Sequence, residues 1–228
     1  MALSGQGLRA TKKARTREAI SDAATALFRD HGFEHVTVAD IAEAADVSIK
    51  TVFNYFSTKE DLFFDRADEL IEGLVRAIEE RPAGVPVTQA IHRLLRDNMV
   101  PFAGAGWHGL RDPEGYERYR GFVATEHAAA ALRARRLVIA EAWTGRLAGV
   151  VAHELGLREG DQRAEVLAAM LVGAMGARER TLATAVLERR SAATVQRRVR
   201  AVVDEAFERI GRAFGDIDTG APAPARRA

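Results

Sequence analysis

Apolar residues recur along this chain at intervals of three and four, which is the spacing of one face of an α-helix. The first such stretch is 16–31, where Ile20, Ala24 and Phe28 share one side, and Gly32 marks its end. Comparable periods predict further helices at 37–45, 48–56, 58–81, 87–100, 116–136, 137–157, 161–190 and 193–214. No stretch alternates as a strand would, so the fold class we expect is all-α.

Residues 37–56 form the most informative stretch, because they read as two short helices joined by a tight bend. Thr37 stands three residues before Asp40, as in a capping box, and Ser48 is the natural N-cap of the second helix. The second helix carries small, basic, amide and aromatic side chains on its outward positions. A helix of this kind fits the major groove of DNA, where residues near its N-terminus reach base edges.

Specific DNA contacts follow from the side-chain chemistry of this pair. Lys50 can donate to guanine O6 and N7, while Ile49 and Thr51 can touch a thymine methyl group. Asn54 can reach a base or a phosphate. Thr37 offers a hydroxyl and a free backbone N–H to a phosphate, and Lys59 follows at the start of the next helix. The expected DNA-binding residues are Thr37, Ser48, Ile49, Lys50, Thr51, Phe53, Asn54, Tyr55 and Lys59.

The formal net charge of the chain is +1, but its distribution is uneven. Five basic residues and no acidic residue occur up to Arg17. We expect residues 1–13 to form a flexible basic arm, which would add attraction for phosphates. A solvated tail without a partner is an equally good interpretation of the same residues.

The stretch 16–62 resembles the N-terminal domain of TetR-family transcriptional repressors. The resemblance is carried by Phe28-Arg29-Asp30-His31-Gly32-Phe33, Thr37-Val38-Ala39-Asp40-Ile41-Ala42, Val47-Ser48, Tyr55-Phe56 and Lys59-Glu60-Asp61-Leu62. Lys50 stands where the family commonly has a small residue, and Phe53 stands where it has a tyrosine that contacts a phosphate. Tyr55 retains a hydroxyl. Packing of Phe53, and solvation or phosphate binding by Lys50, remain the alternatives to base reading.

The resemblance also implies how the rest of the chain is organised. It implies a helix-turn-helix DNA-binding domain at 14–62 (the two-helix motif at 37–56) and a helical ligand-binding and dimerisation domain at 63–214. Residues 215–228 lack periodicity, and we expect them to be disordered. The implied function is a homodimeric regulator, a repressor in most of the family, that binds a palindromic operator and is released by a small molecule.

The run 166–177 is apolar around its whole circumference and is therefore expected to be buried on all sides. Ala169, Gly173 and Ala177 repeat every four residues, so another helix can approach closely. The segments 161–190 and 193–214 are the expected dimer interface. A core helix within one chain is the alternative.

Aromatic and polar residues within the apolar pattern of the larger domain are the candidates for a ligand pocket. A pocket of this composition suits a mostly apolar effector with one or two polar anchors. Ordinary core packing is the alternative for each residue. The candidates are Met99, Phe102, Trp107, Tyr116, Tyr119, Phe122, His127, Trp143, His153 and Met170.

Other classes of function find little support in the sequence. The chain has no cysteine, no catalytic constellation and no metal-binding spacing, so we expect neither an enzyme nor a cofactor or metal site. The glycines at 104–109 match a phosphate-binding pattern but follow no strand. We expect no signal peptide and no membrane span, and hence a cytoplasmic protein. Its abundant alanine and arginine are typical of a GC-rich bacterial genome. A helical carrier or enzyme, and a nonspecific architectural DNA binder, remain the rival functions.

Overall fold

The computed structural model describes residues 3–97, 110–215 and 217–218, and every regular element in these ranges is an α-helix. The all-α expectation is therefore confirmed for the described residues. The chain divides into two compact units. Unit 1 contains the chain up to Asp65 together with Ala124–Arg135, and unit 2 contains Arg66–Val123 and the chain from Arg136 onward.

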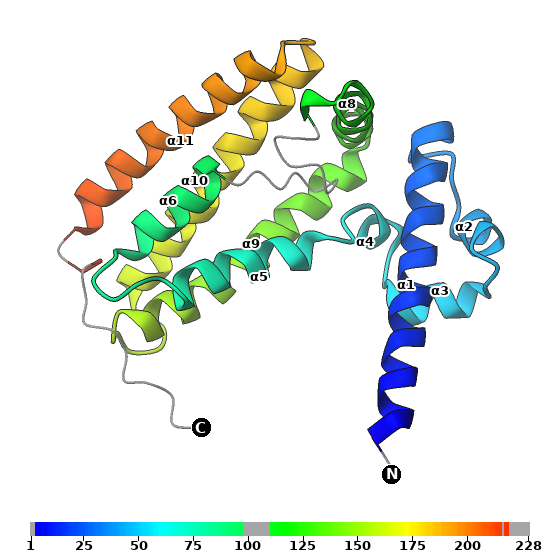
Figure 1. Ribbon diagram of the computed structural model, residues 1–228, viewed down its shortest axis with the longest axis horizontal. Helices are drawn as coiled ribbons and strands as arrows, with labels where there is room; N and C mark the ends of the chain where they lie inside the picture. Colours follow the sequence, from blue (N-terminus) through cyan, green and yellow to red (C-terminus); the bar gives the residue numbers. More distant parts are fainter. Residues whose placement is uncertain (1–2, 98–109, 216, 219–228) are drawn as a thin grey trace. The chain divides into compact units, whose positions relative to one another are not determined.

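Unit 1 is built on a long first helix, with two short helices at its side (Figure 1). Helix α1 packs against both α2 and α4, and α2 packs against α3. Side chains from all of these helices fill one core, which includes Ile20, Phe28, Ile41, Val52 and Leu62. Its helices are α1 (Leu3–His31), α2 (Val38–Ala44), α3 (Ile49–Tyr55) and α4 (Lys59–Phe63).

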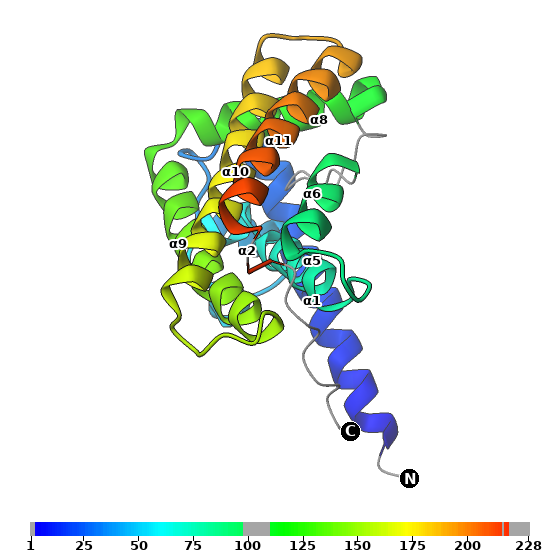
Figure 2. The same ribbon diagram turned by 90° about the vertical axis from the view of Figure 1, so that its left-hand side faces the viewer.

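Unit 2 is a helical bundle in which α10 and α11 run side by side, with α6 against both (Figures 1 and 2). The valines of α11 at positions 195, 199 and 203 repeat every four residues and are all buried against these neighbours. Helix α5 packs on α6. The helices are α5 (Ala67–Glu79), α6 (Val87–Asp97), α8 (Pro113–Ala128), α9 (Ala130–Glu154), α10 (Gln162–Leu187) and α11 (Ala192–Phe214).

The helix expected at 58–81 is interrupted, because α4 ends at Phe63 and α5 begins at Ala67. The neighbouring rings of Phe63 and Phe64 are both buried, at 5.1 Å and nearly perpendicular to each other. Asp65 is held by α1, since its carbonyl accepts a hydrogen bond from Arg17 at 2.8 Å and its carboxylate accepts one from the Ser21 hydroxyl. These tertiary contacts replace the helical hydrogen bonds that periodicity predicted.

The ends of the chain also differ from expectation. Residues 3–13, expected as a flexible arm, are the first turns of α1. Ile217 and Asp218 fall in the tail that we expected to be disordered, yet Asp218 is 3% exposed. Its carboxylate accepts hydrogen bonds from the backbone N–H and the hydroxyl of Thr88, in the first turn of α6. The boundary expected at 136 lies instead at Ala129, between α8 and α9.

Helix α10 is not buried on all sides within the single chain, contrary to the expectation for 166–177. Leu167, Leu171 and Met175 are buried, as the inner face requires. Val166 is 52% exposed, and Ala169 and Gly173 are also exposed. The prediction that residues 166–177 are buried on every side is therefore wrong for the single chain, which leaves one apolar side of α10 exposed.

Arg81 ties three segments of unit 2 together. Its guanidinium forms an ion pair with Glu154 at the end of α9, with N···O at 2.6 Å and side-chain exposures of 8% and 15%. The same group donates to the carbonyl of Ile78 at 2.6 Å and to that of Val85 at 3.0 Å. One cation thus satisfies the end of α5 and the turn that follows it.

We expect Arg81→Ala to lower the free energy of unfolding by about 3–5 kcal/mol, because it leaves the Glu154 carboxylate buried without its partner. The double variant Arg81→Met/Glu154→Met removes both charges and should recover part of that loss. Chemical denaturation of the three proteins measures both effects. Equal stability of Arg81→Ala and the original chain would contradict this role.

Candidate nucleic-acid interface

An aromatic cluster joins α1, the loop that follows it and α4 in the core of unit 1. The ring of Phe28 lies 5.1 Å from that of Phe33 and 6.0 Å from that of Phe63. Ring pairs at these distances stabilise a core beyond their buried area. Val52 and Phe56, on the inner side of α3, are 1% and 4% exposed, so the opposite side of this short helix faces away from the core.

Thr37 and Asp40 form a complete capping box at the start of α2. The Thr37 hydroxyl accepts from the backbone N–H of Asp40 at 3.2 Å, and the Asp40 carboxylate accepts from the backbone N–H of Thr37 at 2.7 Å. The backbone N–H of Thr37, together with the Thr37 hydroxyl, which donates to the same carboxylate at 2.8 Å, holds the pKa of the Asp40 carboxyl below its usual value. The expectation of a free backbone N–H at Thr37 is therefore wrong in this structure, because the carboxylate occupies it.

The bend before α3 is a tight turn followed by a helix cap. Asp46 has a φ of 52°, a left-handed conformation that aspartate tolerates better than most residues. The backbone N–H of Val47 donates to the carbonyl of Ala42 at 2.9 Å and closes the turn. The Ser48 hydroxyl then accepts from the backbone N–H of Thr51 at 3.0 Å, so the predicted N-cap is confirmed.

The outward face of α3 combines apolar and polar side chains. Ile49 is 47% exposed and Phe53 is 51% exposed, and both are among the exposed large apolar residues of the chain. Lys50 and Asn54 lie beside them and are also exposed. Since Phe53 does not enter the core, this face offers both apolar contact and hydrogen-bonding groups to a partner.

Two other candidates of α3 are less available. Thr51 and Tyr55 are half-buried. The Thr51 hydroxyl lies 2.7 Å from the Ser48 hydroxyl, so both groups are already hydrogen-bonded within the chain. A base contact by Thr51 would therefore use its methyl group.

Lys59 is bound within unit 1. Its ammonium donates to the carbonyls of Phe33 at 2.8 Å and Val36 at 3.0 Å, and lies 4.1 Å from the centre of the Phe33 ring. Those carbonyls belong to the loop between α1 and α2. Lys59 thereby fastens that loop to the start of α4, a structural role that the sequence did not indicate.

Seven of the ligand candidates lie among the described residues, and they differ in burial. Tyr119 and Trp143 are buried, while His127 and His153 are exposed on the surface. The Tyr116 hydroxyl donates to the carbonyl of Arg190 at 2.7 Å, and partial burial raises its pKa. Phe122 and Met170 are half-buried. Met99, Phe102 and Trp107 lie outside the described residues.

The sequence analysis did not single out a buried ion pair on α10. Arg178 and Glu179 are 2% and 8% exposed, and they pair with each other. Arg178 also donates to the carbonyl of Leu95 at 3.2 Å, and the Tyr119 hydroxyl lies 3.5 Å from the Glu179 carboxylate. Two adjacent charges near the end of an apolar run were the available signal. Their burial depends on α6 and α8, which the sequence of α10 does not reveal.

The described residues show neither a metal-binding cluster nor a membrane-spanning helix. No group of three or more His, Asp or Glu side chains among them is placed to hold a metal ion. None of the helices in the same part of the chain combines the length and the apolar character needed to cross a bilayer.

Sequence comparisons place the N-terminal unit among known regulators. A profile described as "Bacterial regulatory proteins, tetR family" matches residues 20–65. The HTH-type transcriptional regulator TcmR of Streptomyces glaucescens is 39% identical over 92 residues, which are 40% of this chain and 41% of TcmR. LuxR of Vibrio harveyi, also an HTH-type regulator, is 42% identical over 60 residues, or 26% of this chain and 27% of LuxR. The chain thus matches about two fifths or less of the length of these two relatives.

Solved structures extend the likeness to the rest of the chain at the level of fold. The SmeT–triclosan complex aligns with a TM-score of 0.51 and 19% identity, covering 94% of this chain and 98% of SmeT. A TetR-family regulator from Streptomyces coelicolor A3 aligns with a TM-score of 0.50 and 23% identity, covering 86% and 96%. The relatives are transcriptional regulators rather than enzymes. Residues 20–65 thus match the tetR-family profile of bacterial regulatory proteins, and the chain as a whole shares the fold of these solved regulators.

Proposed function

We propose that this protein binds a palindromic operator as a homodimer through α3, represses transcription there, and is released by a small, mostly apolar effector. The outward face of α3 carries this proposal. Ile49, Lys50, Phe53 and Asn54 are exposed on a helix that Ser48 caps and Val52 anchors. Such a face supplies an amine, an amide and apolar contacts where a recognition helix meets base edges. The site of action would be the DNA of a bacterial cytoplasm.

Each candidate residue has a defined part in this proposal. Lys50 reads guanine, Ile49 and the methyl group of Thr51 contact thymine methyl groups, and Asn54 contacts a base or phosphate. Ser48 holds the start of the helix. The Phe53 ring packs against the sugar edge of the groove. The hydroxyl of Tyr55 approaches a phosphate, and that of Thr37 would do so by exchanging the Asp40 carboxylate, to which it donates at 2.8 Å, for a phosphate oxygen.

A second copy of the chain is supported by the outer side of α10. Val166, Ala169 and Gly173 are exposed there, although their apolar character favours burial. Small residues allow the same helix of a partner to approach closely. The outward positions of α11 carry ion pairs such as Arg209–Glu205, so α11 would contribute a charged border to the interface. A two-fold dimer would place its two α3 helices about 34 Å apart, one turn of DNA.

Effector binding belongs to unit 2 in this proposal. Tyr119 and Trp143 are the candidates best buried among apolar neighbours, with Leu147 and Val151 on the same side of α9 as Trp143. One solved structure of this fold is a SmeT–triclosan complex. For the present chain, a mostly apolar effector suits the composition of the candidate residues. An effector acts by binding better to a dimer whose α3 spacing does not fit DNA.

Selection of random duplex DNA by the purified full-length protein tests the proposed function. We expect an enriched palindrome whose half-sites are about one helical turn, roughly 10 base pairs, apart. Protein shown by light scattering to be dimeric serves as the input. Binding without enrichment of any sequence would favour an architectural DNA binder, and the absence of DNA binding at low salt would contradict the proposal altogether.

Alanine substitution of Lys50 and of Thr51 tests the assignment of base contacts. Each substitution should weaken binding by ~1–3 kcal/mol and relax the preference at the base pair that the side chain reads. Repeating the selection with each variant identifies that base pair. Glu43→Ala, an exposed change on α2, is the control. Variants that keep the original preference at every position would remove these two residues from the reading face.

Substitution of Lys59 separates a structural role from a phosphate contact. Lys59→Met keeps the apolar stem but removes two hydrogen bonds from a charged donor, so stability should fall by about 2 kcal/mol. DNA affinity measured well below the melting temperature should then change little, as should its salt dependence. A weakened salt dependence with unchanged melting temperature would instead assign Lys59 to a phosphate.

A further inference from the structure

The two-helix motif carries a net negative charge, which is unfavourable for binding DNA. Residues 37–56 contain one cation, Lys50, and three acidic residues, Asp40, Glu43 and Asp46, which gives a net charge of −2. Much of the affinity of a protein for DNA comes from cations that neutralise phosphates. Cations elsewhere in unit 1 must therefore supply that attraction if α3 is to be held in the groove.

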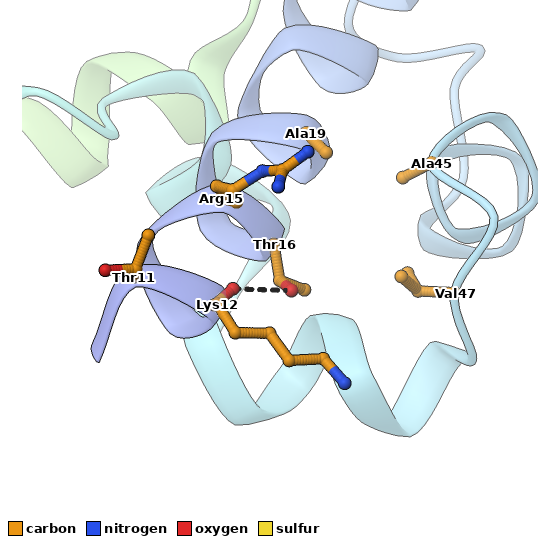
Figure 3. Close-up of a pocket in the computed structure, with 7 residues that line it drawn as sticks. All are labelled: Thr11, Lys12, Arg15, Thr16, Ala19, Ala45 and Val47. Atoms are coloured by element: carbon orange, nitrogen blue, oxygen red, sulfur yellow. Dashed lines mark hydrogen bonds between the residues drawn. The ribbon is translucent and has the colours of Figure 1, made fainter. Parts of the chain in front are cut away.

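An open groove of about 500 Å³ lies between α1 and the bend that precedes α3. Figure 3 shows Lys12 and Arg15 on the side of α1, facing Ala45 and Val47 across the gap. Ala19 adds a third small apolar side chain to the wall. Val47 is followed directly by Ser48, so the groove adjoins the end of α3 at which a recognition helix meets base edges.

The charged groups of this groove are all positive. The residues that line it include no aspartate or glutamate. Lys12 and Arg15 are exposed, and among the described residues neither side chain forms an ion pair or a hydrogen bond. Arg17, two residues further on, differs because it donates to the carbonyl of Asp65 and lies 4.8 Å from the centre of the Phe56 ring.

We propose that this groove binds the sugar–phosphate backbone of one operator strand beside the bases read by α3. The proposal rests on the proposed function and adds a second contact surface to it. Deoxyribose presents C–H groups that pack against Ala19, Ala45 and Val47, while Lys12 and Arg15 bind the phosphates on either side of the sugar. An acidic peptide would satisfy the cations but needs partners for its backbone N–H groups, which these alanine and valine side chains do not provide.

The helical geometry of α1 supports binding to neighbouring phosphates. Residues three apart on a helix have Cβ atoms about 5–6 Å from each other, so Lys12 and Arg15 project from one face. The hydroxyl of Thr16, the residue after Arg15, donates to the carbonyl of Lys12 at 3.0 Å, as the dashed line in Figure 3 shows. Because both cations stand on one helical face, α1 presents them at a fixed spacing to neighbouring phosphates.

A matched pair of neutral variants tests the cations. Lys12→Gln removes a charge from the groove, whereas Lys13→Gln removes the same charge from an exposed position that does not line it. For the full-length protein on its selected operator, log K should depend less steeply on log salt concentration in Lys12→Gln, by about 0.9 for each phosphate that is no longer neutralised. Lys13→Gln should change the slope much less. Operator preference should stay the same in both, because binding to a phosphate carries no sequence information.

A second matched pair tests the groove itself. Ala19→Glu places a carboxylate in the groove, and Ala14→Glu adds the same charge to an exposed position of α1 outside it. Ala19→Glu should weaken operator binding at least about tenfold more than Ala14→Glu at low salt, because its carboxylate repels the phosphates that the groove receives. Melting temperatures of both variants verify that the fold is retained.

The outcomes separate this inference from the proposed function. If the unsubstituted protein selects an operator but the two members of each pair behave alike, the groove does not bind the backbone and α1 contributes general charge only. If the unsubstituted protein selects no operator, the proposed function itself fails before the variants are measured. A difference within each pair, with unchanged operator preference, establishes that the groove binds the DNA backbone.

Discussion

The presentation of α3 depends on contacts outside it, because a helix of seven residues does not form stably in water. Ser48 supplies the cap and Val52 the buried anchor, while the left-handed turn at Asp46 sets the direction in which the helix starts. The ring cluster of Phe28, Phe33 and Phe63 belongs to the core of the same unit. Every α3 group proposed to contact DNA is positioned by this small set of interactions, so recognition and folding of unit 1 are coupled.

Local signals predicted the parts of unit 1 that depend on local chemistry. The capping residues Thr37 and Ser48, the stop at Gly32 and the inner positions of α3 lie where the pattern of the sequence predicts them. The break between α4 and α5 could not be predicted in this way. It depends on Arg17 and Ser21 binding Asp65, which is 48 and 44 residues away from them along the chain, and nothing local in 58–81 indicates those partners.

The same distinction separates the DNA-binding candidates from the ligand candidates. Exposure of Ile49, Lys50, Phe53 and Asn54 follows from one helical face and one anchored residue. A pocket forms where several helices converge. Amino-acid composition does not show which side chains of those helices point into it. His127 and His153 satisfied the compositional criterion yet lie on the surface, whereas the buried pair Arg178–Glu179 was missed. Charged residues in the interior are stabilised by each other and by a carbonyl of α6, which are relations of the folded chain.

The cations of unit 1 divide by what they bind, and this division bears on function more than the net charge does. Arg17 and Lys59 interact with backbone carbonyls and aromatic rings, so they consolidate the unit. Lys12, Arg15 and Lys50 are exposed. The net charge of this protein is only +1. Such a protein can still attract DNA if its exposed, unpaired cations lie close together near the recognition helix and its acidic residues lie elsewhere. Because residues 37–56 carry a charge of −2, attraction for phosphates in the proposed function has to come largely from cations outside that motif.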